Sequence, residues 1–329
     1  MPDNTWYTPY ILPLEDCLSS AAFQGVAYKL SEDFVLKMPY QYPVQDLESF
    51  DNDEGVEQLE LSQSSIDSFK VERTFYQSLA NARQQYIVKA DVSTLQYGII
   101  LEHLQPLEQA WYASSVRPSH RWIRQFLRAN TQLEMLGYTH GDLGIRNMGV
   151  DKNGDLKLFD FGSVHRHSDE GFPRGIERDL SRFATCLHFL LSGKDPLANI
   201  KDLQSLRQIQ SALKSGTFEV DVSALPAQDI LNICWAEDLS VMEPVHPTMV
   251  FRHVERLVLR ALNIPDSDCY MHEASLHQSS TGPDERSGSQ LGELVCLVPN
   301  RDGNPVVPDP RWMPEEQYDE AWRVKGVTT

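Results

Sequence analysis

Apolar and polar residues alternate in several stretches near the start of the chain, and this is the pattern of half-buried β-strands. Residues 25–39 read as two short strands joined by a polar turn, with Lys37 in the second strand. Residues 86–93 and 97–104 read as another pair of strands. The pattern therefore predicts a small antiparallel sheet in this part of the chain.

An acidic block lies between these strands. Residues 44–68 contain eight acidic residues and no Lys or Arg. Because like charges repel and the block has little apolar surface to bury, we expect a mobile acidic insertion. A helix should follow, with Ser64 as its N-cap and Asp67 three residues later. Its apolar face would include Phe69 and, unusually, the carboxylate of Glu72.

The second half of the chain changes to a helical period. Residues 118–137, 177–196 and 250–262 place apolar side chains at steps of three and four, which predicts helices with one buried face. Asn153-Gly154 predicts a hairpin turn between the first two helices. Strands followed by helices indicate the α+β class.

The end of the chain shows no periodic pattern. Residues 265–290 are rich in Ser, His and Gly, which is typical of a linker. Five prolines between Pro299 and Pro314 predict an extended tail. The expected organisation is an N-terminal lobe at 1–104 with the acidic insertion, a helical lobe at 105–264, and a linker with tail at 265–329.

Composition narrows the possible partners and compartments. The 329 residues include 29 basic and 47 acidic side chains, a net charge of −18, which argues against a nucleic-acid or membrane partner. The five cysteines are scattered and form no CxxC pair, as expected for reduced thiols. No apolar run approaches the roughly 20 residues that span a bilayer. We therefore expect a soluble cytoplasmic or nuclear protein. The oligomeric state is left open.

The candidate catalytic residues are polar and lie at fixed spacings along the chain. His140-x-Asp142 is followed five residues after the aspartate by Asn147, and Asp160-Phe161-Gly162 begins thirteen residues after that. This combination resembles the catalytic core of the protein-kinase-like superfamily. The resemblance covers roughly residues 15 to 262 and implies a two-lobed kinase-like fold that binds ATP between its lobes.

The resemblance also implies roles for these residues. Phosphoryl transfer depends on positioning and on stabilisation of charge more than on covalent help from the protein. Asp142 matches the catalytic base that faces the acceptor hydroxyl. Asn147 and Asp160 match the ligands of Mg²⁺, which prefers hard oxygen donors.

Upstream positions match the nucleotide-binding lobe of the same superfamily less completely. Lys37 occupies the place of the lysine that binds the α- and β-phosphates, and Glu72 is its natural ion-pair partner. Of the glycine-rich loop, only Gly25 remains, with Ser20 and Ala22 near where the other glycines would fall.

Residues 102–104, with Glu102 and Leu104 at their ends, occupy the position of the hinge that meets adenine. Asp179 resembles the residue that anchors the catalytic loop.

Two departures leave the acceptor open. Gly141 stands where many protein kinases have an arginine, and only 19 residues separate Asp160 from Asp179, without an APE motif. Transfer of the γ-phosphate to a Ser or Thr hydroxyl on a protein is the leading hypothesis. A small-molecule kinase, a catalytically weak pseudokinase-like scaffold and an AMP transferase are the alternatives. Turnover of ATP with an acceptor would separate the enzymes from the scaffold.

Overall fold

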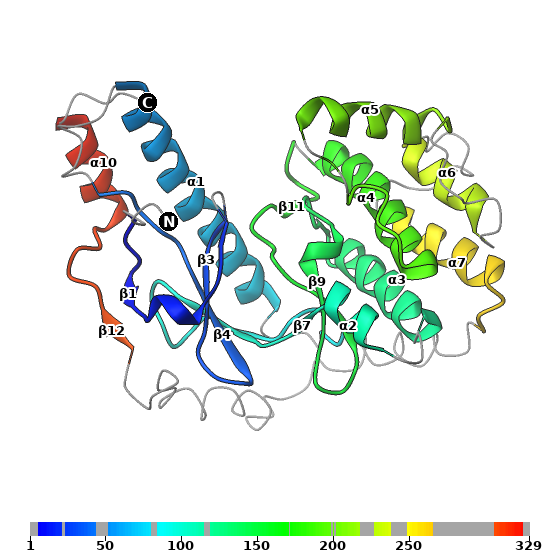
Figure 1. Ribbon diagram of the computed structural model, residues 1–329, viewed down its shortest axis with the longest axis horizontal. Coiled ribbons are helices and arrows are strands. Elements are labelled where there is room, and N and C mark those ends of the chain that lie inside the picture. Colours follow the sequence, from blue (N-terminus) through cyan, green and yellow to red (C-terminus); the bar gives the residue numbers. More distant parts are fainter. Residues whose placement is uncertain are drawn as a thin grey trace. The chain divides into compact units, whose positions relative to one another are not determined.

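The computed structural model divides into two compact units, which are described separately (Figure 1). Unit 1 comprises Met1–Gln84, Val88–His103 and Asp284–Thr329, and unit 2 comprises Gln85–Ile87 and Leu104–Pro283. Small antiparallel sheets and several helices give a mixed α/β structure that is compatible with a two-lobed kinase-like fold. The structure describes residues 6–21, 24–43, 52–79, 84–114, 119–170, 172–198, 200, 202–217, 227–237, 249–265 and 306–324.

Unit 1 is built on a five-stranded antiparallel sheet in the order β2-β3-β4-β6-β5. Alternate side chains fill its core, among them Val26, Tyr28, Leu36, Met38 and Ile100. Both hairpins predicted from the sequence are present, although the second is shorter than expected. The strands are β2 (Cys17–Ala21), β3 (Gly25–Lys29), β4 (Phe34–Met38), β5 (Ala90–Asp91) and β6 (Ile99–Glu102).

One long helix, α1 (Asn52–Leu79), packs against β3 and corrects two predictions. The mobile acidic insertion at 44–68 is wrong for residues 52–68, which are helical, and residues 44–51 lie outside the described part. The helix also begins twelve residues before the predicted cap at Ser64. Its first half did not show the apolar pattern because two of its buried side chains end in hydroxyl groups.

Ser62 and Ser65 are those hydroxyls. Both are fully buried, and their Oγ atoms accept hydrogen bonds from the backbone N–H groups of Tyr42 (3.0 Å) and Tyr40 (3.1 Å). They therefore fasten α1 to the segment that leaves β4. A polar contact of this kind satisfies backbone groups that would otherwise be costly to bury.

The end of the chain is part of unit 1, and the tail that the sequence predicted to be extended contains a helix. Strand β12 (Val307–Pro308) pairs with β1 (Tyr10–Ile11), and α10 (Glu315–Val324) follows it. The buried Gln41 carboxamide exchanges two hydrogen bonds with the backbone of Met313, at 2.8 and 3.2 Å. The residues of the expected linker after 265 lie outside the described part.

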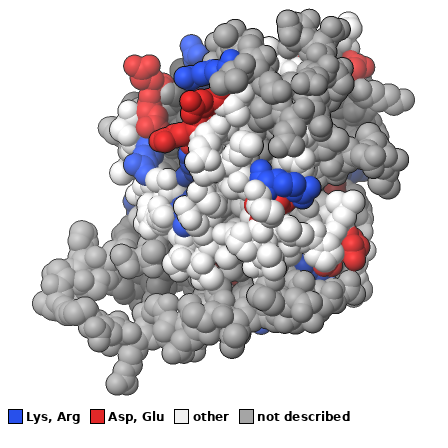
Figure 2. All heavy atoms as spheres, turned by 90° about the vertical axis from the view of Figure 1, so that its left-hand side faces the viewer, with Lys and Arg blue, Asp and Glu red and all other residues white. Residues whose placement is uncertain are grey.

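Helix α10 covers the first half of α1. Tyr318 and Trp322 form a buried cluster with Leu59, and the Tyr318 hydroxyl shares its proton between the Tyr42 carbonyl and Ser62 Oγ, each at 2.8 Å. An ion pair joins α1 to α10. On this side of the molecule, charged side chains of both signs occur in small mixed groups (Figure 2).

Unit 2 is mainly helical. Helix α3 contacts both α4 and α7, with the Phe126 and Phe183 rings stacked at 4.9 Å. The buried Glu134 carboxylate accepts the N–H groups of Phe251 and Arg252 at the start of α7. The helices predicted at 118–137, 177–196 and 250–262 are all present. The helices are α2 (Leu107–Ala113), α3 (Ser119–Met135), α4 (Phe172–Ser192), α5 (Leu203–Lys214), α6 (Gln228–Ala236) and α7 (Val250–Ala261).

Short strands flank the His140–Asp142 and Asp160–Gly162 motifs in unit 2. Two hairpin strands, β9 and β10, form a sheet with β7, and β8 pairs with β11. Among the described residues, no helix is long and apolar enough to cross a membrane. The strands are β7 (Gln105–Pro106), β8 (Tyr138–Thr139), β9 (Met148–Val150), β10 (Leu156–Leu158) and β11 (His165–Arg166).

Replacing Trp322 by Ala tests the role of α10. The side chain is fully buried, so we expect a loss of about 3–5 kcal/mol in the free energy of unfolding, measured by urea titration. Amide hydrogen exchange should show faster exchange in residues 52–68. Gln317→Ala, an exposed position on the same helix, is the control. Equal stability of the two variants would show that α10 does not hold α1.

Candidate active site

The loop from His140 to Asp142 is held by a buried carboxylate of α4. Asp179 Oδ2 accepts hydrogen bonds from the backbone N–H groups of His140 (2.6 Å) and Gly141 (3.0 Å). Burial raises the pKa of the Asp179 carboxyl, although these donors oppose the shift. The structure thus contains the anchor that the sequence predicted, and it fixes the backbone immediately before Asp142.

Gly141 is required by the local geometry. Its φ is +75°, and a Cβ atom at this position would lie 1.8 Å from the carbonyl oxygen of Ser163. No residue with a side chain fits without moving that segment. The replacement of arginine by glycine is therefore explained by the close approach of the chain that follows Asp160-Phe161-Gly162.

His140 contacts the segment that leads into Asp160-Phe161-Gly162. Its Nε2 lies 3.2 Å from the Phe159 carbonyl oxygen, and its ring packs 4.8 Å from that of Phe161. Phe161 is fully buried. These contacts tie the two halves of the motif together.

Two arginines and an asparagine surround the carboxylate of Asp142. Arg146 Nη2 lies 3.0 and 2.7 Å from its two oxygens, and Arg182 Nη1 bonds Oδ1. Asn147 Nδ2 donates to the Asp142 carbonyl (2.7 Å) and to Oδ2 (3.2 Å). Burial acts to raise the pKa of Asp142, but Arg146 and then Arg182 outweigh it, so the pKa is lowered. The carboxylate stays ionised and fixed in orientation.

Asn147 and Asp160 are brought together by the hairpin β9–β10. The Phe159 N–H donates to the Asn147 carbonyl at 3.0 Å, so the residue before Asp160 is bonded directly to Asn147. Asp160 has a φ of +68°, an uncommon value outside glycine that is frequent at functional turns. The pair expected to bind metal therefore lies on adjacent backbone segments.

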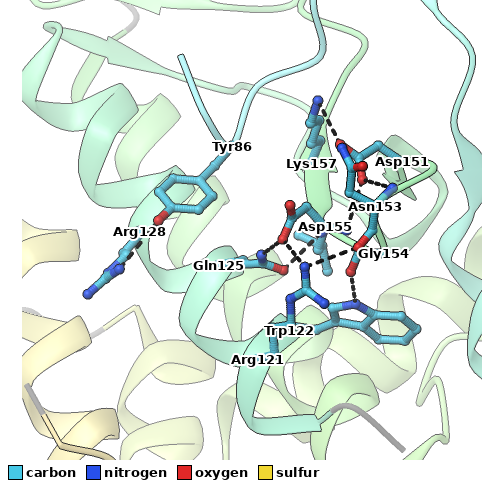
Figure 3. Close-up of polar contacts among 11 residues, drawn as sticks. Tyr86, Arg121, Trp122, Gln125, Arg128, Asp151, Asn153, Gly154, Asp155 and Lys157 are labelled. Atoms are coloured by element: carbon cyan, nitrogen blue, oxygen red, sulfur yellow. Dashed lines mark hydrogen bonds and ion pairs between the residues drawn. The ribbon is translucent and has the colours of Figure 1, made fainter. Parts of the chain in front are cut away.

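Side chains of helix α3 form hydrogen bonds with the backbone of the β9–β10 hairpin (Figure 3). Gln125 Oε1 accepts the Leu156 N–H at 2.9 Å, and Trp122 Nε1 donates to the Gly154 carbonyl at 3.0 Å. Within the hairpin, Lys157 forms a buried ion pair with Asp151 at 3.2 Å. These contacts fix the span that separates Asn147 from Asp160.

The donor set fits magnesium. Asn147 donates from its amide nitrogen to Asp142, and its backbone carbonyl accepts the N–H of the residue before Asp160. Its carboxamide oxygen and the Asp160 carboxylate are donors of the kind that magnesium prefers. In the described part of the chain, no three His, Cys, Asp or Glu side chains are placed to hold a metal together. A magnesium ion here would complete its coordination with phosphate oxygens and water, as is usual for this ion.

Unit 1 contains the predicted partner pair. Lys37 Nζ lies 2.5 Å from Glu72 Oε2, and both side chains are buried. Lys37 comes from β4 and Glu72 from the second half of α1. Breaking a buried pair of this kind is strongly destabilising, so α1 is held against the sheet at this point.

The remaining residues that the sequence predicted to bind the nucleotide are Gly25, Glu102 and Leu104. Gly25 begins β3 with a φ of +99°, and a Cβ there would lie 2.4 Å from the Met38 carbonyl. Its presence is thus explained by the sheet alone. Ala22 and the Ser20 side chain lie outside the described residues. Glu102 accepts the Lys89 N–H at 2.8 Å, and the division between the units falls just before Leu104.

Arg182, which contacts the candidate base Asp142, was not predicted from the sequence. It lies one helical turn after Asp179, and the sequence contains no motif that marks it. Arg146 was not among the predicted site residues either, and in the structure it binds the carboxylate of Asp142, the candidate base.

No protein-family model matches the chain. The chain is similar to Protein kinase kin1 of Schizosaccharomyces pombe, with 26% identity over 123 residues. The similarity covers 31% of this chain and 13% of kin1, so the chain spans only a small part of that relative's length. This distant similarity indicates a kinase-like relationship.

A comparison of the single variants Gly141→Ala and Gly216→Ala tests the close approach of Gly141 to Ser163. Both glycines have positive φ, but a Cβ at Gly216 would meet nothing within 4 Å. We expect Gly216→Ala to cost about 1–2 kcal/mol from backbone strain. Gly141→Ala should cost a further 1–3 kcal/mol or so from overpacking. If both variants lose the same free energy of unfolding in urea titrations, the segment at Ser163 moves aside without cost.

Proposed function

We propose that the protein is an ATP- and Mg²⁺-dependent phosphotransferase that acts on a hydroxyl group, most simply a Ser or Thr hydroxyl of a protein. The observation that carries the proposal is the geometry around Asp142. A carboxylate is kept ionised by two arginines and lies beside an asparagine that is bonded to the segment leading to Asp160. The distant similarity to a protein kinase supports the same reaction class.

Asp142 is proposed as the base that orients the acceptor hydroxyl. In a loose phosphoryl-transfer transition state the hydroxyl proton leaves late, so orientation matters more than base strength. A lowered pKa is compatible with that task. Arg146 and Arg182 would also stabilise negative charge near the transferring group.

Asn147 and Asp160 would hold Mg²⁺, and Lys37 would bind the α- and β-phosphates of ATP. Glu72 positions Lys37 through the buried ion pair. When bound, the metal supplies charge neutralisation on the phosphate oxygens. Gly25, Glu102 and Leu104 remain proposed contacts for the nucleotide.

A non-catalytic scaffold is the second candidate. Both oxygens of Asp142 are already engaged by arginines, so an acceptor hydroxyl must displace a contact to reach the carboxylate. A kinase-like chain that only holds partners could retain this arrangement without turnover.

Calorimetry with ATP, with and without Mg²⁺, tests the nucleotide site. We expect Mg²⁺ to tighten ATP binding to the wild type and to have little effect on Asp160→Asn, because a carboxamide is a weaker ligand than a carboxylate. Asp229→Asn, at an exposed position of α6, is the control. Failure of the wild type to bind ATP under either condition would leave the scaffold as the better candidate.

Asp142→Asn tests the base. We expect phosphoryl transfer to fall by about 10²–10⁴-fold because the carboxylate is lost. Mg²⁺-ATP binding should remain close to that of the wild type. Transfer is measured with labelled ATP against a protein extract and against the protein itself. Undiminished transfer by Asp142→Asn would remove Asp142 from this role.

A further inference from the structure

Three arginines on one face of α4 lead to the carboxylate of Asp142. Arg174, Arg178 and Arg182 are spaced four residues apart, so they follow one face of the helix for about 12 Å. Arg174 and Arg178 are exposed, and Arg182 is partly buried against Asp142. We call these three residues the arginine stripe.

The outer part of the stripe has no internal function in the fold. The side chains of Arg174 and Arg178 form no ion pair or hydrogen bond with any residue that the structure describes. Of the acids nearby, Asp179 is buried beneath the loop, and the exposed Asp169, Glu170 and Glu177 form no ion pair with Arg174 or Arg178. Glu177 is the one exposed acid of the same helix within the stripe's length.

This positive surface belongs to a chain with a net charge of −18. Arg182 is paired with Asp142, so among the described residues Arg174 and Arg178 are the part of the stripe that is left for a partner. Charge of one sign beside a candidate base favours a substrate of the opposite sign.

The position of the stripe is fixed at both ends. At its start, Gly175 lets α4 approach β8 closely, since a Cβ there would lie 2.7 Å from Thr139 Oγ1. At its end, Arg182 bonds the carboxylate of Asp142. The stripe thus runs beside the strand that enters the loop and finishes at the candidate base.

We propose that the arginine stripe binds an acidic segment of a polypeptide acceptor and presents its hydroxyl to Asp142. The proposal rests on the proposed phosphotransferase function and names its substrate class. An extended peptide advances about 3.3 Å per residue, so acidic side chains about two and four residues from the hydroxyl would meet Arg178 and Arg174. Arginine binds carboxylates in a planar, two-bond geometry.

Other anions fit less well. A small acidic metabolite would contact Arg182 and Arg146 but would leave the outer two arginines without a function. A long nucleic acid would be repelled by the net charge of the chain. An acidic peptide matches both the length of the stripe and its modest charge.

Fluorescence anisotropy at low ionic strength tests the proposal on the full-length protein. The probe is a labelled peptide with one serine flanked on both sides by glutamates, and its neutral match has glutamine in place of each glutamate. We expect the acidic peptide to bind more tightly than the neutral one. The double variant Arg174→Gln/Arg178→Gln should weaken binding of the acidic peptide by about five- to twentyfold, from two exposed pairs.

The control is a second double variant that also removes two positive charges. Arg256 and Arg260 are exposed, also four residues apart, and lie on α7. Arg256→Gln/Arg260→Gln should bind the acidic peptide as the wild type does. Equal binding of the two peptides, equal loss in both double variants, or no binding up to millimolar peptide would overturn the proposal. A single-stranded oligonucleotide that binds more tightly than the peptide through Arg174 and Arg178 would also overturn it.

Calorimetry with Mg²⁺-ATP on the same samples separates this proposal from the proposed function. The Arg174→Gln/Arg178→Gln variant should bind the nucleotide as the wild type does. Nucleotide binding without peptide binding would reject the acidic acceptor and leave the phosphotransferase intact. Peptide binding without nucleotide binding would reject the phosphotransferase and retain the stripe as a docking surface.

Discussion

The structure of the candidate site depends on two side chains of α4 that act one helical turn apart. Asp179 accepts the N–H groups of His140 and Gly141, and Arg182 bonds the carboxylate of Asp142. The first contact fixes the backbone of the loop, and the second fixes the direction of its carboxylate. Because both come from one buried helix, the geometry of the base is set by the helical core and does not depend on the loop alone.

A comparable constraint organises unit 1. Glu72 reaches Lys37 only if α1 lies correctly against the sheet, and the first half of α1 is held by contacts from distant parts of the chain. Tyr318 and Trp322 come from the end of the sequence, and Ser62 meets the segment after β4. The last helix is therefore a structural component of the unit that presents Lys37.

The sequence predicted best where a periodic pattern, a turn signal or a family motif marks the structure. The hairpins, the apolar helices, the Lys37–Glu72 pair and the Asp179 anchor follow from period, turn residues and the resemblance to a known family. The first half of α1 was not predictable from its own pattern, because its buried serines and acidic surface resemble a disordered segment. Arg182 was missed for a related reason: only the folded backbone shows that it meets Asp142.

The electrostatics of the site constrain which chemistry it can perform. Two arginines lower the pKa of Asp142 and so weaken it as a base, which would be a disadvantage for a reaction that removes a proton early. Phosphoryl transfer through a loose transition state has no such requirement, and it gains from nearby positive charge. In the proposed reaction the same arginines would attract an anionic acceptor towards the carboxylate. The charge distribution around Asp142 therefore suits the proposed transfer to an acidic substrate better than general proton abstraction.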